Sequence, residues 1–331
     1  MEKVGLSPPP IYTICNIIYN IIMLQIITIQ QKDGKCIQIP FTDFYNIDSK
    51  SVIYIDCSSI QSGLHKLDYL NFSNLEIFYY VGNELDSIPD MFFPNLKIFD
   101  CSFNQLTILP YNIDNCYNLI KLSCNDNKLT ILPNMNFPNL QILYCFCNEL
   151  TILPTGMYLP ELLQLKCFDN KLQSLPDNMN FSNLQILYCG NNQLLSLPNL
   201  MNFPNLLNFD CSNNLLKSLP NNMNFSNLKY FDCVNNQLKS LHDNMNFPNL
   251  ERFNYSNNQL ESLSDNMNFS NLEWFNCSNN QLELLPICIL NFQHLQTFQY
   301  TNNRIEISLQ FARFIDRINN RENNLINVYN D

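Results

Sequence analysis

Glycine, histidine, tryptophan and basic side chains are all scarce in this sequence of 331 residues. It contains six Gly, three His and one Trp, and 18 Lys and Arg stand against 29 Asp and Glu, a net charge of −11. So few glycines leave no room for a phosphate-binding loop, and neither G-x-G-x-x-G nor G-x-x-x-x-G-K-[ST] occurs. The acidic balance argues against binding the phosphates of DNA or RNA. We therefore expect a neutral or basic partner and no nucleic acid.

Catalytic and cofactor motifs are also missing. His65, His242 and His294 lie far apart, and no Ser/His/Asp or Cys/His group follows from their positions. Most cysteines recur about every 22 residues, so on stacked repeats they would form a row and would not converge on a metal ion. We therefore expect no enzyme activity, no cofactor and no metal site.

The sequence does contain an internal repeat, mostly 22 residues long. Each unit reads L-x-x-[FL]-x-[CY]-x-x-N-x-L-x-x-L-P, and positions are counted below from its first Leu. Positions four to six alternate apolar and polar residues, as in Phe209-Asp210-Cys211, which predicts one short strand per repeat. Stacked repeats would form a parallel sheet over one continuous core. The eleven clear units begin at Leu75, Leu96, Leu119, Leu140, Leu162, Leu184, Leu206, Leu228, Leu250, Leu272 and Leu295, and a degenerate twelfth precedes them around Val52, Ile55 and Cys57.

Position nine is Asn in all eleven units. A buried carboxamide offers two donors and an acceptor, so it can bond backbone groups of its own turn and of the adjacent turn. We expect Asn214→Ala to destabilise the fold and Asn213→Ala, next to it, to be nearly neutral. The column consists of Asn83, Asn104, Asn127, Asn148, Asn170, Asn192, Asn214, Asn236, Asn258, Asn280 and Asn303.

Position six is most often Cys. The favoured interpretation is a small inward-facing apolar residue, with cross-strand disulfides as a lesser alternative. Buried free thiols in consecutive repeats indicate a reducing compartment, and we expect a cytoplasmic location. The column consists of Cys57, Cys101, Cys124, Cys145, Cys167, Cys189, Cys211, Cys233 and Cys277.

The repeat resembles the leucine-rich-repeat family, whose pattern is L-x-x-L-x-L-x-x-N-x-L, over about three quarters of the chain. Leu-Pro endings such as Leu175-Pro176 are similar to the short intracellular type, and the composition looks most like the leucine-rich-repeat proteins of giant amoeba viruses. The resemblance implies an α/β-type solenoid, a curved horseshoe with short parallel strands on its concave face. We expect the convex side to be mostly extended or 3₁₀, with little helix outside the caps. A non-catalytic protein-binding role is also implied.

The two ends differ from the repeats, which predicts a cap over residues 1–50, a solenoid over 51–303 and a capping helix with a tail over 304–331. Residues 11–29 carry no charge and are long enough to span a membrane, but their amides favour a packed cap. A membrane anchor and a signal peptide remain alternatives. Near the other end, Ser308 can cap a helix with apolar residues at 309, 312, 315 and 318.

Several outward positions of the predicted strands carry large side chains where most repeats have small polar ones. Aromatic residues and Arg dominate interface energies, so these positions predict a protein or peptide site on the concave face, although they could merely cover the sheet. Asp100, Asp210 and Asp232 flank them and favour a partner that is basic at its rim. We expect a monomer; the alternatives are an adaptor for a host enzyme such as a ubiquitin ligase, or a membrane-anchored receptor. The candidate residues are Ile142, Tyr144, Phe146, Phe168, Ile186 and Tyr188, and further along Tyr230, Arg252 and Trp274.

Overall fold

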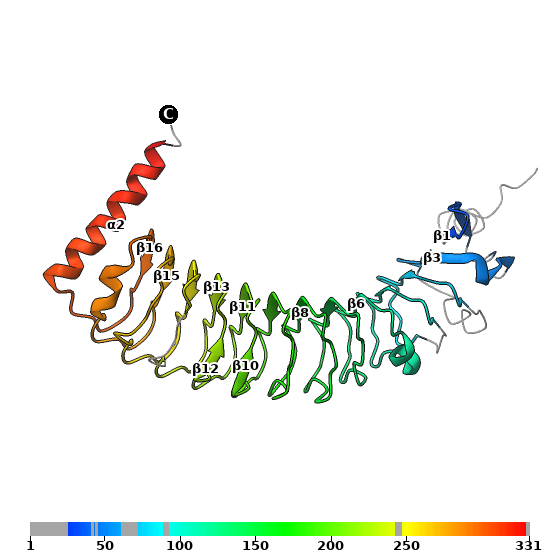
Figure 1. Cartoon of the computed structure of the whole chain (residues 1–331), viewed down its shortest axis with the longest axis horizontal. Coiled ribbons are helices and arrows are strands. Elements are labelled where there is room, and N and C mark those ends of the chain that lie inside the picture. The colour runs from blue at the N-terminus through cyan, green and yellow to red at the C-terminus, as the bar shows by residue number, and fades with distance from the viewer. Residues whose placement is uncertain are drawn as a thin grey trace, which may run out of the picture.

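The computed structural model describes residues 26–40, 43, 46–60, 72–88, 93–241 and 247–328. Within these ranges the chain forms a 14-stranded sheet with the order β16-β15-β14-β13-β11-β9-β8-β7-β6-β5-β4-β3-β1-β2. From β3 to β16 all neighbours are parallel, one strand per repeat. Figure 1 shows these strands along the inner edge of a curved solenoid. The predicted horseshoe with strands on its concave face is confirmed.

Most of the parallel strands are three residues long and occupy positions three to five of their repeats. The middle residue points into the core and its two neighbours face outward, as period-two alternation requires. The degenerate first repeat also forms a strand, as predicted. The strands are β3 (Val52–Asp56), β4 (Ile77–Tyr79), β5 (Ile98–Asp100), β6 (Lys121–Ser123), β7 (Ile142–Tyr144), β8 (Gln164–Lys166), β9 (Ile186–Tyr188), β11 (Asn208–Asp210), β13 (Tyr230–Asp232), β14 (Arg252–Asn254), β15 (Trp274–Asn276) and β16 (Thr297–Gln299).

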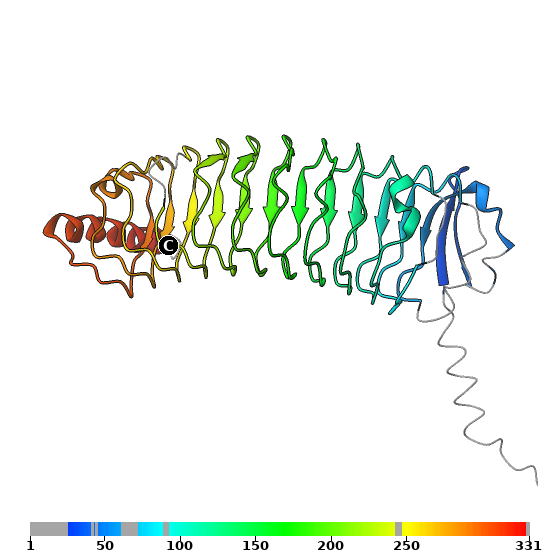
Figure 2. The ribbon, with the colours of Figure 1, turned by 90° about the horizontal axis from the view of Figure 1, so that it is seen from below.

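The convex side is mostly extended chain, as expected, with 3₁₀ turns at Tyr111–Asn115 and Ile287–Asn291; a further 3₁₀ turn, Ser49–Ser51, directly precedes β3. It also holds a feature that the sequence did not predict. The short strands β10 (Leu200–Asn202) and β12 (Asn222–Asn224) pair in parallel to form a second, two-stranded sheet. Figure 2 shows successive repeats stacked side by side along the molecule.

The core is built from columns of identical positions in successive repeats. The phenylalanines of the convex tail stack in one column, with ring centroids 6.0 Å apart for Phe203–Phe225 and again for Phe225–Phe247. All nine cysteines of position six are buried, which confirms their predicted place in the core. The described cysteines are free thiols, and some donate across the stack, as Cys189 Sγ does to the carbonyl of Asp210 at 3.4 Å.

The Asn column forms the predicted ladder between repeats. Asn214 illustrates it: Oδ1 accepts from the backbone N–H of Leu194 in the preceding repeat at 3.0 Å. Its Nδ2 lies 3.1 Å from the carbonyl oxygen of Cys189 in the preceding repeat, and 3.1 and 3.0 Å from those of Cys211 and Ser212 in its own. Each amide therefore fastens two repeats together as well as closing its own turn.

Position eight, just before this Asn, has left-handed backbone in almost every repeat. The φ angle is 52° at Asn213 and 67° at Gly82, and equivalent residues along the stack have similar values. Asn, Asp and Gly adopt this conformation more easily than other residues, which explains why they are common at the position. We therefore revise the expectation for Asn213→Ala from nearly neutral to mildly destabilising, because Ala would have to keep this backbone conformation.

A second amide ladder runs along the exposed side of the stack. It uses the Asn that precedes most first leucines, a position outside the predicted ladder. Asn227 Nδ2 donates to the carbonyl of Pro204 at 2.9 Å, and Asn249 Nδ2 to that of Ser226 at 2.9 Å. The repeat at Leu162 has Glu161 at this position, where the amide donor is missing.

The N-terminal edge of the sheet is covered by an antiparallel hairpin of β1 (Ile26–Gln31) and β2 (Cys36–Pro40). β1 pairs antiparallel with β3, and Ile27 and Ile29 are buried. Most of the uncharged segment 11–29 lies outside the described residues. Within the described ranges, no helix combines the length and the apolar character needed to cross a membrane.

At the other end, the predicted helix is present as α2 (Leu309–Val328). Ser308 caps it, since its Oγ accepts from the backbone N–H of Phe311 at 3.4 Å. The predicted apolar face was partly wrong: Leu309 is 70 % exposed, whereas Phe311, Phe314 and Ile318 are buried. The helix turns this face toward the last repeat, where the Phe314 ring lies 6.5 Å from that of Phe298 in β16.

Candidate interface on the concave face

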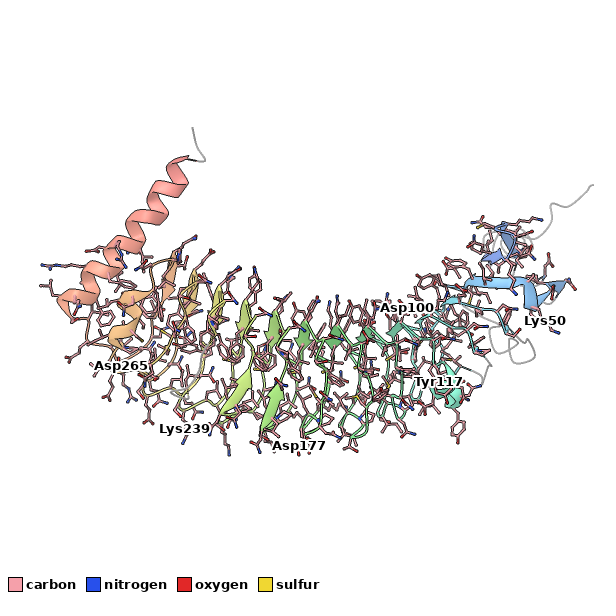
Figure 3. The ribbon with its side chains drawn as sticks, viewed as in Figure 1. Lys50, Asp100, Tyr117, Asp177, Lys239 and Asp265 are labelled. Atoms are coloured by element: carbon pink, nitrogen blue, oxygen red, sulfur yellow. The ribbon has the colours of Figure 1, made fainter. Side chains whose placement is uncertain are left out.

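The outward side chains of the strands form three rows that cross the concave face, at positions three, five and seven. The parallel register aligns each row from one strand to the next. Figure 3 shows Asp100 on this concave side, whereas Asp177 and Lys239 mark the convex side. From β7 onward, row three reads Ile142, Gln164, Ile186, Asn208, Tyr230, Arg252 and Trp274; row five reads Tyr144, Lys166, Tyr188, Asp210, Asp232, Asn254 and Asn276; row seven reads Phe146, Phe168, Gly190, Ser212 and Val234.

Six of the candidate residues lie together over β7, β8 and β9, and we call them the aromatic patch: Ile142, Tyr144, Phe146, Phe168, Ile186 and Tyr188. All six side chains are half-buried. The rings of Phe146 and Phe168 are stacked, with centroids 4.5 Å apart and planes 7° from parallel. The Tyr144 ring lies 6.2 Å from that of Phe146. Neighbouring rings hold one another, so the patch presents a rigid apolar surface.

Lys166 completes the patch, although it is not among the predicted site residues. It stands between two tyrosines in row five, with its Nζ 4.7 Å from the ring centroid of Tyr144 and 5.5 Å from that of Tyr188. The Tyr144 hydroxyl donates to Gln164 Oε1 at 2.6 Å. A cation over the face of a ring is attracted by its quadrupole, so Lys166 helps to fix both tyrosines.

The other three candidates occupy row three on the consecutive strands β13, β14 and β15. Tyr230 is 43 % exposed, and the Arg252 guanidinium lies 5.1 Å from the ring centroid of Trp274. They are not a separate site. Together with Tyr188 of the aromatic patch they line one open hollow of about 480 Å³, which also includes Asp210 and Asp232. We call this the acidic hollow.

Gly190 marks the boundary between the aromatic patch and the acidic hollow. It occupies row seven directly after Phe168, where another ring would extend the stack. A Cβ at this position would lie 2.9 Å from Ser212 Oγ and 3.1 Å from Asp210 Oδ1, so a side chain there would displace both groups. The missing side chain ends the aromatic row and makes room for the Asp210 carboxylate.

The aspartates of row five differ in their counter-charges. Asp100 lies 3.7 Å from Lys121 Nζ, whereas Asp210 and Asp232 form no ion pair with a described Lys or Arg. Both use one oxygen to accept a backbone N–H two residues later, from Ser212 at 2.8 Å and from Val234 at 3.0 Å. The other oxygen of Asp232 accepts from Asn254 Nδ2 at 3.2 Å. Burial raises the pKa of the Asp232 carboxyl above its ordinary value, and the neighbouring Asp210 raises it further. Two adjacent carboxylates thus remain without a cation.

Of the three histidines, His65 and His242 lie outside the described residues, and His294 is exposed. Over the part of the chain that the structure describes, no cluster of His, Cys, Asp and Glu is arranged to hold a metal ion. The buried thiols are poor nucleophiles at neutral pH, because burial raises the pKa of Cys167 to about 12. The described surface therefore offers contact chemistry, namely rings, amides and carboxylates.

Comparison with known proteins supports the fold assignment. Residues 198–274 match the family described as "Leucine-rich repeat and WD repeat-containing protein 1, LRR". No curated protein matches the sequence significantly. Among solved structures, a leucine-rich-repeat protein of Leptospira interrogans is 24 % identical, with a TM-score of 0.57 over 81 % of this chain and 88 % of that one.

Two further structures are similar over most of this chain but belong to longer chains. The functional domain of InlJ from Listeria monocytogenes, which includes a cysteine ladder, is 23 % identical with a TM-score of 0.62, over 80 % of this chain and 57 % of that one. Toll, from the Drosophila Toll–Spatzle complex, is 21 % identical with a TM-score of 0.58, over 77 % and 42 %. These likenesses establish the leucine-rich-repeat fold.

Proposed function

We propose that this leucine-rich-repeat chain is a non-catalytic interaction scaffold that holds a protein or peptide partner on its concave face. One observation carries the proposal: six large side chains gather into the aromatic patch, on a face whose fifth and seventh positions are mostly Asn, Ser or Asp in the other repeats. A contiguous exposed apolar patch usually marks a contact site. Solved structures of the same fold include complexes with protein partners, as in the Toll–Spatzle complex.

The dimensions of the face support the same function. Eleven spacings of about 4.8 Å separate the twelve parallel strands, which gives a sheet roughly 50 Å wide. That is enough for the patch of about 800 Å² that each partner buries in a standard interface. In this proposal residues 51–303 supply the recognition surface, while 1–50 and 304–331 act as caps, and the chain works as a monomer with a partner that is basic at its rim.

The cellular setting is a further part of the proposal. Nine buried thiols at position six favour a reducing compartment such as the cytoplasm. In an oxidising compartment these thiols would tend to form disulfides whenever the chain is unfolded and they are exposed. The Asn- and Ile-rich composition favours a viral origin with a host protein as the partner. Cell fractionation combined with a protease-accessibility assay tests the location.

The test of the function begins with affinity purification from the native cell and mass spectrometry of the proteins that co-elute. For a partner obtained in this way, Tyr144→Ala/Phe168→Ala should weaken binding at least tenfold, because both rings leave the centre of the aromatic patch. Tyr117→Ala/Tyr158→Ala is the matched control, since it removes two exposed rings, 53 % and 57 % accessible, elsewhere in the same part of the chain. Binding that survives the first change and is lost with the second would refute a concave site.

A further inference from the structure

The acidic hollow is distinct from the aromatic patch in its chemistry. Its walls combine two carboxylates, Asp210 and Asp232, with the rings of Tyr188, Tyr230 and Trp274. The two residues are direct neighbours, since β11 and β13 pair Asp210 with Asp232 in register on strands about 4.8 Å apart. Like charges at this distance raise each other's energy, and a cation placed between them would relieve that cost.

We propose that the acidic hollow binds one basic side chain, Lys or Arg, of a peptide that lies across the concave face. This inference rests on the proposed function, because it names the chemistry of one contact within the same interface. Asp210 and Asp232 provide the anionic contacts, and Tyr230 and Trp274 provide the aromatic walls. The carboxylates attract a cation through their charge, and the flanking rings attract it through their quadrupoles.

Another aspartate of row five has its counter-charge within the chain. Asp100, in the same row, has Lys121 Nζ at 3.7 Å, and the space between Tyr144 and Tyr188 is filled by Lys166. Among the described Lys and Arg residues, none forms an ion pair with a carboxylate of the hollow. Arg252 lines the hollow, but its guanidinium stacks on Trp274 and forms no ion pair with either carboxylate. The missing cation is the one that a partner would bring.

An independent observation also indicates a donor from outside. Asn208, in row three between Ile186 and Tyr230, lines the hollow, and its Oδ1 is buried without a hydrogen-bond partner. Buried polar atoms in folded proteins are nearly always hydrogen-bonded, so an acceptor left alone beside an open hollow suits an N–H from a ligand. A Lys ammonium carries three donors and an Arg guanidinium five, enough for both carboxylates and this amide oxygen.

Size and position fit a side chain that belongs to a longer ligand. A volume of about 480 Å³ lies within the range of about 300–1,000 Å³ for pockets that hold small ligands. Tyr188 belongs to both the patch and the hollow, and Asp232 lies two strands further on. Two strand spacings are about 10 Å, which an extended peptide covers in about three residues. We therefore place the basic residue about three positions from the residues that contact the aromatic patch.

The experiment uses the full chain and a phage-displayed library of random dodecapeptides as the probe. Peptides that bind should be enriched in Lys or Arg. In the best of them, replacing the basic residue by norleucine or citrulline should weaken binding at least tenfold. Binding should change the fluorescence of Trp274, the only tryptophan in the chain, because its ring lines the hollow. A library that yields no binder, or binders without basic residues, overturns the proposal.

The matched variants are Asp210→Asn/Asp232→Asn and, as a control, Asp100→Asn. Asn is already accepted at this position, since Asn254 Oδ1 and Asn276 Oδ1 take the backbone N–H two residues later at 3.3 and 3.0 Å. In the double variant, the selected peptide and its uncharged analogue should bind equally; in the control, their tenfold difference should remain. Should the double variant unfold, Asp232→Asn alone should reduce the difference at least threefold. If the difference in affinity between the selected peptide and its uncharged analogue is unchanged, the proposed cation subsite is wrong.

The outcomes separate this inference from the proposed function. If Tyr144→Ala/Phe168→Ala abolishes peptide binding while Asp210→Asn/Asp232→Asn leaves the preference for a basic residue intact, the concave interface stands and the cation subsite is wrong. If the preference depends on the two aspartates but binding ignores the aromatic changes, the subsite stands and the aromatic patch is not the contact surface.

Discussion

The two sides of each strand follow opposite rules. On the inner side, positions four, six and nine hold nearly the same residue in every repeat, and the described members are almost all buried. On the outer side, positions three, five and seven change from strand to strand, as row five does from Tyr144 through Lys166 to Asp210. The inner positions must stack on copies of themselves, whereas the outer positions meet solvent or a partner. Uniformity therefore marks the residues that stabilise the solenoid, and variation marks those that can recognise something.

The largest difference between the two sides should come from removing a ring. Phe225→Ala deletes a buried ring that contacts Phe203, Phe247 and Phe209, at centroid distances of 6.0, 6.0 and 5.7 Å. The cavity should cost about 3–5 kcal/mol in the free energy of unfolding. Phe168→Ala removes a half-buried ring of the aromatic patch and should cost about 1 kcal/mol. Urea denaturation followed by circular dichroism measures both, and equal midpoints would contradict the distinction.

A smaller loss should follow from breaking the buried amide ladder. Asn214→Ala leaves the buried N–H of Leu194 without its acceptor, whereas the carbonyl of Cys189 still accepts from Asn192 Nδ2 at 3.2 Å. Unsatisfied buried groups should cost about 1–3 kcal/mol. Asn213→Gly is the control, because the side chain of Asn213 is partly exposed and Gly can keep the left-handed backbone. The unfolding midpoint of this variant should stay close to that of the unchanged protein. If Asn213→Gly is as unstable as Asn214→Ala, the amide ladder does not explain the loss of stability.

The smallest expected effect on the free energy of unfolding comes from the backbone conformation of Asn213, as distinct from its side chain. Asn213→Ala retains a Cβ at φ 52°, where non-glycine residues other than Asn and Asp are disfavoured. The substitution should cost about 1 kcal/mol through backbone strain, and Asn213→Gly should not show this cost. Thermal unfolding of the two variants provides the comparison. If Ala and Gly are equally stable at this position, the left-handed conformation imposes no constraint there.

Most of the fold could be predicted because the repeat pattern reports directly on burial. An apolar residue at position four and Asn at position nine recur in each of the eleven clear units, and the structure places their described members in the core or at its turns. The details that were missed are local. The apolar face of α2 rotates from Leu309 to Phe311 and Phe314 because the helix docks on the last repeat. The β10–β12 pair depends on how two convex segments meet.

The candidate site was predicted in part for the same reason. Outward positions could be counted from the period, so the aromatic residues were found without a structure. Lys166 and Gly190 were missed, because a lysine on a strand surface and a single glycine carry no signal of their own. Their roles depend on neighbours about 22 residues away in the chain: Lys166 stands between two rings, and Gly190 leaves space for Asp210.

The sequence by itself determined that the chain stacks short parallel strands over columns of Leu, Phe, Cys and Asn, since a repeated burial pattern leaves few other ways to cover its apolar side. Only the tertiary structure decided which outward side chains touch. Strand register sets Asp210 beside Asp232, and side-chain conformation stacks Arg252 on Trp274 and leaves both carboxylates without a cation. Such contacts join residues of different repeats across a few ångströms, a distance that no spacing along the chain encodes.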